Sequence, residues 1–168
     1  MLSFVLLMTF PVAMAFAGAN DLFTMRIPNK ISLVLIVSFI AAAFAIGLNH
    51  ETAAIHAAIG AAVLIVTYML FSFNLLGGGD AKLMAAGALW MGLDHVFEFL
   101  LLLTFFGGIL AAMIWVYRKF VPIAVGALPG WLEKLHEDGA GMPYGIAIAA
   151  AGLAVYPSTD VFRLLSGN

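Results

Sequence analysis

An aspartate and three glycines interrupt an apolar stretch near the middle of the chain. Residues 74–82 read Asn-Leu-Leu-Gly-Gly-Gly-Asp-Ala-Lys, and the sequence on either side is apolar. An ionisable residue at such a junction is costly unless it faces water, a partner or a substrate, so Asp80 is a candidate functional residue. Gly77, Gly78 and Gly79 allow backbone angles closed to other residues and let another chain approach closely. The alternative is structural, because carboxylates also cap the starts of helices.

Hydrolysis by carboxylates needs two of them in one place. One takes a proton from water while the other donates a proton to the carbonyl oxygen of the bond that is cut. Like charges held close cannot both ionise easily, so the two titrate as a coupled pair. Asp21, at the end of the first apolar segment, is a candidate partner for Asp80. No Ser-His-Asp set or cluster of metal ligands competes, because the histidines are scattered, and we expect neither a metal nor a cofactor.

The composition indicates whether the chain is surrounded by water or by lipid. Of 168 residues, 64% are hydrophobic and 10% charged, whereas soluble domains are roughly a quarter charged. A net charge of -2 without a basic stripe argues against a nucleic-acid partner. The absence of cysteine excludes disulfides, thiol catalysis and cysteine-ligated metal. We therefore expect one integral-membrane domain over residues 1–168, with lipid as its surroundings.

Six apolar segments predict an all-α polytopic membrane protein with six transmembrane helices. The first lacks the basic start of a signal peptide, so we expect it to be retained. The fourth gives only about 18 Å of helix at 1.5 Å per residue, short of a roughly 30 Å hydrocarbon core. Either Asp80 is set below the membrane surface or the bilayer is thinned locally. The segments are residues 2–19, 31–48, 53–73, 81–92, 96–117 and 142–156.

The connections carry their own predictions. Thr52 could cap the third helix, His56 is expected to pack rather than to bind a ligand, and residues 93–95 should form a turn. In the long connection 121–140, Leu128, Trp131, Leu132 and Leu135 share one helical face, which is typical of an amphipathic helix lying on the membrane. A polar tail should follow the last span.

Basic residues set the orientation of these spans, because they favour the cytoplasmic side. The first, third and fifth connections carry lysine or arginine, and the second and fourth carry none. Odd connections are therefore expected inside and both chain ends outside, with Arg163 as the exception. This places Asp21 and Asp80 at the same, cytoplasmic face. The basic residues of the odd connections are Arg26, Lys30, Lys82, Arg118, Lys119 and Lys134.

Three motifs in this order resemble those of the type IV prepilin leader peptidases, the GxGD membrane aspartyl proteases. Gly-Gly-Gly-Asp-Ala-Lys at residues 77–82 is similar to their G-x-G-D-x-K signature. Asp21, followed by Arg-Ile-Pro-Asn at residues 26–29, resembles the segment that carries their first aspartate. Met-Pro-Tyr-Gly at residues 142–145 is similar to the P-[FY]-G element that opens their last helix.

The resemblance implies that Asp21 and Asp80 are the catalytic pair of a peptidase in the bacterial inner membrane. It implies a pilin precursor as substrate, cleaved after a glycine at the cytoplasmic boundary, with the pilus-assembly machinery as a further partner. The small size resembles the branch dedicated to tight-adherence (Flp-type) pili. Larger relatives carry an added N-terminal region, often with cysteine pairs, and also methylate the new N-terminus. This chain has neither that region nor any cysteine, so methylation is not expected. The supporting residues would be Gly77, Gly78, Gly79, Lys82, Arg26, Pro28, Asn29, Pro143, Tyr144 and Gly145.

Several of these supporting residues also have plainer explanations. Arg26 and Lys82 would favour ionised carboxylates nearby, or would serve only topology and headgroup contact. Asn29 and Asn74 could hydrogen-bond the loop or the substrate, and Pro143 with Tyr144 could simply shape the last helix. Two other functions also stay open. A small transporter or channel could use Asp80 at a broken helix, and a pilus-assembly scaffold would need neither aspartate.

Overall fold

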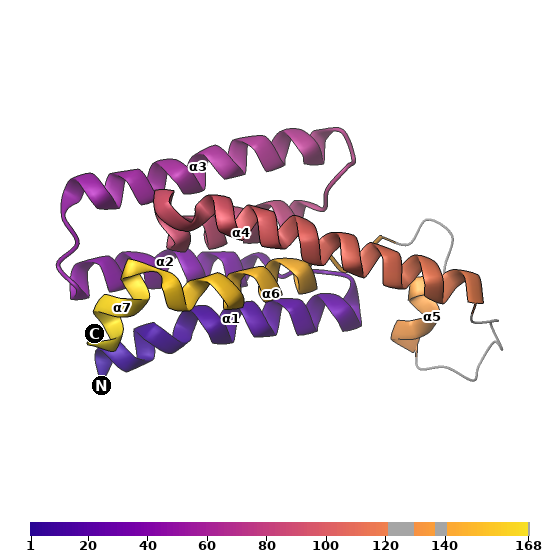
Figure 1. The fold of residues 1–168 in the computed structure, drawn as a ribbon, viewed down its shortest axis with the longest axis horizontal. Coiled ribbons are helices and arrows are strands. Elements are labelled where there is room, and N and C mark those ends of the chain that lie inside the picture. The colour runs from indigo at the N-terminus through magenta and orange to yellow at the C-terminus, as the bar shows by residue number, and fades with distance from the viewer. Residues whose placement is uncertain (121–129, 137–140, 168) are drawn as a thin grey trace.

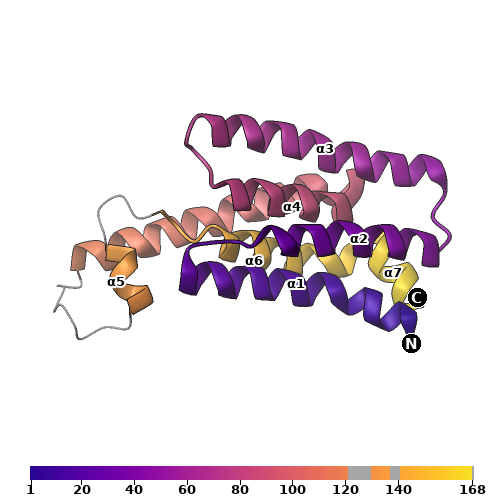
Figure 2. The ribbon, with the colours of Figure 1, turned by 180° about the vertical axis from the view of Figure 1, so that it is seen from behind.

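The computed structural model describes residues 1–120, 130–136 and 141–167, and every regular element within those ranges is helical. The elements are α1 (Leu2–Thr24), α2 (Asn29–Ala45), α3 (His50–Ser72), α4 (Gly78–Phe120), α5 (Gly130–His136), α6 (Gly145–Val155), the 3-10 turn η1 (Tyr156–Ser158) and α7 (Asp160–Ser166). Helix α1 packs against both α2 and α6, and α3 lies outermost against the first half of α4 (Figures 1 and 2). The prediction of an all-α chain is confirmed over the described residues.

Three helices in the described part of the chain are long and apolar enough to cross a membrane, namely α1, α3 and α4. A fourth is counted if α6 with η1 and the following α7, bent by 61°, form one span. The six predicted segments fall on α1, α2, α3, the two halves of α4, and α6. Six membrane crossings require α2 and both halves of α4 to span as well, and this number stays a prediction.

The ends of the helices sort into two groups. Both termini and the α2–α3 connection lie at one end of the bundle, and the α1–α2 and α3–α4 connections lie at the other (Figure 1). Helix α6 also begins at that second end (Figure 1). The segments that carry Asp21 and Asp80 therefore reach the same end.

Aromatic packing around Trp90 holds the helices together. Its side chain is fully buried and contacts the rings of Phe10 in α1, Phe39 in α2 and Tyr156 in η1. The indole N–H donates to the carbonyl of Leu35 at 2.9 Å, so the buried polar atom is satisfied. One residue of α4 thus fixes the relative positions of α1, α2 and the end of α6.

Helix α4 is broken by one residue. Gly92 has φ 65° and ψ -169°, a region open essentially only to glycine. His56 of α3 packs against this break, stacks on Phe39 and donates from Nδ1 to the carbonyl of Leu89 at 2.8 Å. The prediction that His56 is a packed histidine is therefore confirmed.

Several predicted boundaries were wrong, the end of α1 by five residues. Helix α1 continues past Asp21 to Thr24, and the helix resumes directly after Gly92, so residues 93–95 form no turn. Asn49, rather than Thr52, caps α3 by accepting from the Thr52 amide at 2.7 Å. The tail after residue 156 is helical as α7, with Thr159 as its cap.

The predicted surface helix at residues 128–135 is described only in part. Helix α5 covers Gly130–His136, while residues 121–129 and 137–140 lie outside the described residues. Trp131 meets Phe23 of α1 edge-on, and Arg118 at the end of α4 donates to the Leu135 carbonyl at 2.6 Å. Helix α5 is therefore attached to both α1 and α4.

Candidate active site

Asp21 lies in the last two turns of α1 and is 5% exposed. Its Oδ2 accepts a hydrogen bond of 2.8 Å from the backbone N–H of Gly145, the first residue of α6. The first N–H groups of a helix have no partner within it, so this carboxylate satisfies one of them. The hydrogen bond joins α1 to α6 across 124 residues of sequence.

Asp80 lies in the first turn of α4 and is half-buried. Its carboxylate accepts a hydrogen bond from the backbone N–H of Gly77, and Asp21 lies near enough to act on it electrostatically. The structure thus brings together the two aspartates that sequence analysis paired. It also adds Tyr144, whose hydroxyl interacts electrostatically with Asp80.

Glycines make this convergence sterically possible. A Cβ atom on Gly145 would lie 2.9 Å from both Asp21 and the Ile27 side chain, and one on Gly79 would lie 3.1 Å from the Ile27 Cβ. A Cβ on Gly77 would lie 2.5 Å from Asp80 Oδ2. The α1–α2 connection, the α3–α4 connection and the start of α6 therefore approach one another more closely than side chains would allow.

Comparison with protein families agrees with this geometry. A profile described as "Type IV leader peptidase family" matches residues 8–115, nearly two thirds of the chain and both aspartates. The chain belongs to the type IV leader peptidase family. No curated protein and no solved structure matches it. Together with the apolar helices, family membership indicates a peptidase and a multi-pass membrane protein.

The α1–α2 connection is held by polar side chains that sequence analysis did not single out. Asn20 donates to the carbonyl of Arg26 at 2.6 Å, and Thr24 donates to the carbonyl of Asn20 at 2.7 Å. Met25, between Thr24 and Arg26, adopts the left-handed φ of 54°, which reverses the chain after α1. The signal in the sequence was an asparagine directly before the candidate aspartate, with a threonine four residues on, at the end of an apolar helix.

The basic residues proposed as support do not pair with the aspartates. Within the described ranges no lysine or arginine forms a salt bridge with Asp21 or Asp80. Lys82 instead donates to the side-chain oxygen of Asn29 at 2.9 Å, and Arg26 is exposed. Residues two apart on a helix point about 200° apart, so Lys82 and Asp80 lie on opposite sides of α4. Lys82 therefore connects α4 to α2.

The remaining supporting residues shape the backbone of the leader peptidase. Pro28, at φ -62° and ψ 131°, precedes the first turn of α2. Gly78 packs on the Phe71 ring, where a Cβ would lie 3.3 Å away. Pro143 is fully buried just before α6, and the Tyr144 ring covers Gly107 of α4. In the described part of the chain, no three histidine, aspartate or glutamate side chains gather closely enough to hold a metal ion.

Proposed function

We propose that this leader peptidase is an aspartyl endopeptidase in which Asp21 and Asp80 share the hydrolysis of a peptide bond. The observation that carries the proposal is the interaction between these two acids, one buried in α1 and the other in the first turn of α4. Placing two carboxylates in a half-buried site is costly unless the pair has a task. Among the other described acids, Glu51, Asp94, Glu98 and Asp160 are exposed.

The chemistry follows from two carboxylates in different protonation states. The ionised member takes a proton from a water molecule, whose oxygen attacks the scissile carbonyl carbon, while the protonated member donates its proton to the carbonyl oxygen. Collapse of the tetrahedral intermediate breaks the C–N bond, and the leaving amine takes a proton from the pair. The amides of Gly145 and Gly77 hold the two carboxylates in place.

The proposed substrate is the precursor of a Flp-type pilin, with a basic leader in the cytoplasm and an apolar helix in the membrane. Arg26 lies in the α1–α2 connection, and Lys30 and Lys82 lie near the starts of α2 and α4, at the same end of the bundle as the aspartates. Because basic residues favour the inside, we assign that end to the cytoplasmic face of the inner membrane, with six spans and both termini outside. Removal of the leader there would release the pilin for assembly.

Co-expression with candidate Flp-type precursors tests this proposal. Asp21→Asn and Asp80→Asn keep the side-chain size but remove the ionisable group, so each should lower processing by about 10²- to 10⁴-fold. The mature N-terminus is read by mass spectrometry. Glu51→Gln, an exposed acid in the first turn of α3, is the matched control and should process normally.

The results separate the remaining functions. Full processing by either aspartate variant would refute the proposed pair. Absence of any precursor cleavage by the wild type, together with ion or solute flux in liposomes, would favour a transporter. Pilus assembly that survives both asparagine substitutions would favour a scaffold.

A further inference from the structure

A groove runs along the opposite side of α4 from the aspartates. It is lined by residues of α2, α3 and the first half of α4 and has a volume of about 410 Å³. Small residues line much of it, including Ala57 and Gly60 of α3 and Ala85 of α4. Along α2 it extends from Asn29 to Ile36, which is about 10 Å at 1.5 Å per residue. The groove is therefore apolar, and its length is about two thirds of one leaflet of a roughly 30 Å hydrocarbon core.

Polar groups occur at one end of this groove. Lys82 and Asn29 stand at its mouth, joined by the 2.9 Å hydrogen bond from Nζ to Oδ1. That bond leaves the Asn29 amide N–H groups and the remaining Nζ protons available to an acceptor. Within the described ranges Lys82 forms no salt bridge. The mouth is therefore a cationic site with hydrogen-bond donors.

Ser32 lines the groove one helical turn after Asn29 and is 5% exposed. Its hydroxyl is the only buried side-chain oxygen or nitrogen among the described residues that has no hydrogen-bond partner. Leaving a buried hydroxyl unpaired costs free energy, so an acceptor that reached it from the groove would be stabilised. Ser32 follows Asn29 by three residues, so the two lie on one face of α2, about 4.5 Å apart along the helix axis.

We propose that this groove binds one anionic phospholipid. The phosphate contacts Lys82 and Asn29 at the mouth, an ester carbonyl below it accepts a hydrogen bond from Ser32, and an acyl chain lies along the small residues of α3 and α4. The order of groups along the groove, which is cation, amide, hydroxyl and then apolar surface, matches the order of groups along a phospholipid. The lipid would join α2, α3 and α4 on the side away from the aspartates.

Two observations favour a lipid over the apolar helix of a protein substrate. Lys82 and the groove face about 200° away from Asp80 around α4, so a helix seated there would not lead to the aspartates. The cation at the mouth attracts a phosphate and repels a basic leader. The proposal holds whether or not the chain cleaves pilin precursors.

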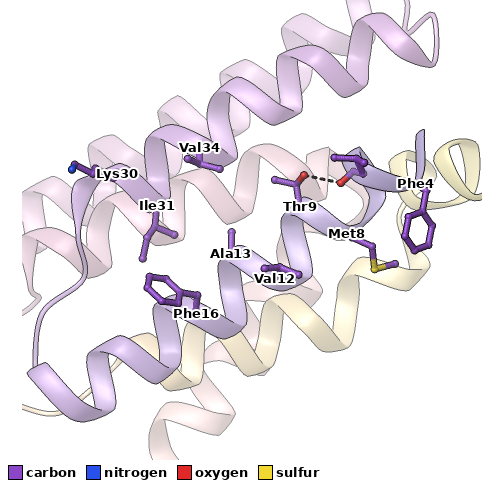
Figure 3. Close-up of a pocket in the computed structure, with 10 residues that line it drawn as sticks. Phe4, Met8, Thr9, Val12, Ala13, Phe16, Lys30, Ile31 and Val34 are labelled. Carbon is purple, nitrogen blue, oxygen red and sulfur yellow. Dashed lines mark hydrogen bonds between the residues drawn. The ribbon is translucent and has the colours of Figure 1, made fainter. Parts of the chain in front are cut away.

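A second groove provides an internal control. It lies between α1 and α2, has a volume of about 570 Å³ and carries Lys30 at its edge (Figure 3). Its one lining hydroxyl, on Thr9, already donates to the Val5 carbonyl at 2.8 Å (Figure 3). This groove has a cation next in sequence to Asn29 but no unpaired buried hydroxyl, so Lys30→Gln is matched to Lys82→Gln.

The test uses the purified full chain in an uncharged detergent. Thermal unfolding and native mass spectrometry are recorded with added phosphatidylglycerol or with phosphatidylcholine of the same acyl chains. Phosphatidylglycerol should raise the unfolding midpoint and stay bound as one molecule, and phosphatidylcholine should not. Ser32→Ala should weaken the apparent affinity about 3- to 10-fold and Lys82→Gln at least about 10-fold, whereas Lys30→Gln should match the wild type.

The Ser32→Ala variant also has a signature without lipid. Because it removes an unpaired hydroxyl, Ser32→Ala should be at least as stable as the wild type before lipid is added. The control is Ser38→Ala, which removes a hydroxyl bonded to the Leu35 carbonyl. It should be less stable than the wild type but respond normally to lipid. Equal responses to the two lipids, or equal losses in the two lysine variants, would overturn the proposal. So would the same stabilisation by inorganic phosphate alone, or displacement of the lipid by a peptide carrying a basic leader and an apolar helix.

Discussion

Replacing Gly145 by alanine tests how tightly the position of Asp21 controls catalysis. The added Cβ would lie 2.9 Å from Asp21 Cβ, Asp21 Oδ2 and the Ile27 side chain, against the 3.4 Å at which ordinary contact begins. The shortfall of 0.5 Å must be met by moving α6 away from α1 or by displacing the carboxylate. A misplacement of about 1 Å can cost about 10²-fold in rate, so Gly145→Ala should slow processing by about 10- to 100-fold.

The assay is the rate of leader removal from a co-expressed pilin precursor, with the unfolding midpoint measured in parallel. Gly108→Ala is the matched control, because Gly108 is also helical and exposed, and nothing lies within 4 Å of its added Cβ. That variant should process normally. Processing by Gly145→Ala at the wild-type rate would refute the claim that the Gly145 contact fixes Asp21. A loss of folded protein would show up in the unfolding measurement and be separated from a loss of rate.

Three further predictions concern stability. Trp90→Ala should lower the unfolding free energy by about 3–5 kcal/mol, measured by unfolding in mixed detergent micelles, and a cost below about 1 kcal/mol would contradict its central role. Gly92→Ala should be more destabilising than Gly47→Ala, although both glycines have φ 65°. The reason is that a Cβ on Gly92 would lie 2.5 Å from the His56 ring, whereas a Cβ on Gly47 would have nothing within 4 Å. Equal unfolding midpoints for the two variants would contradict this. Asn49→Ala should cost about 1 kcal/mol through loss of the α3 cap while leaving processing unchanged, since the cap lies at the opposite end of the bundle from the aspartates.

The sequence allowed the helices and the pairing of the acids to be predicted, because both depend on strong patterns. Long apolar runs have few alternatives to helix in lipid, where every backbone polar group must be satisfied within the segment. Alternation of basic connections then placed Asp21 and Asp80 at one end, which agrees with the arrangement of the connections in the bundle (Figure 1).

Contacts that depend on three-dimensional packing could not be predicted in the same way. The role of the Gly145 amide as a donor to Asp21 and the position of Lys82 beside Asn29 both depend on the distance between helices far apart in sequence. Gly92 was predicted to be the last residue of a helix, whereas in the structure it is a break within α4 that packs against His56. The cap of α7 at Thr159 could have been predicted, since threonine followed by aspartate is a common helix start.

Both aspartates are held by main-chain amides rather than by side chains. A point substitution can crowd such a donor but cannot delete it, unless the new residue is proline. A change in the length of the chain would disrupt these hydrogen bonds more than a substitution. Inserting a single residue in the first turn of α6 would rotate the rest of that helix by about 100° and would present a different amide to Asp21. Among natural relatives, the spacing between Pro143 and the body of α6 should therefore vary less than the side chains that cover it.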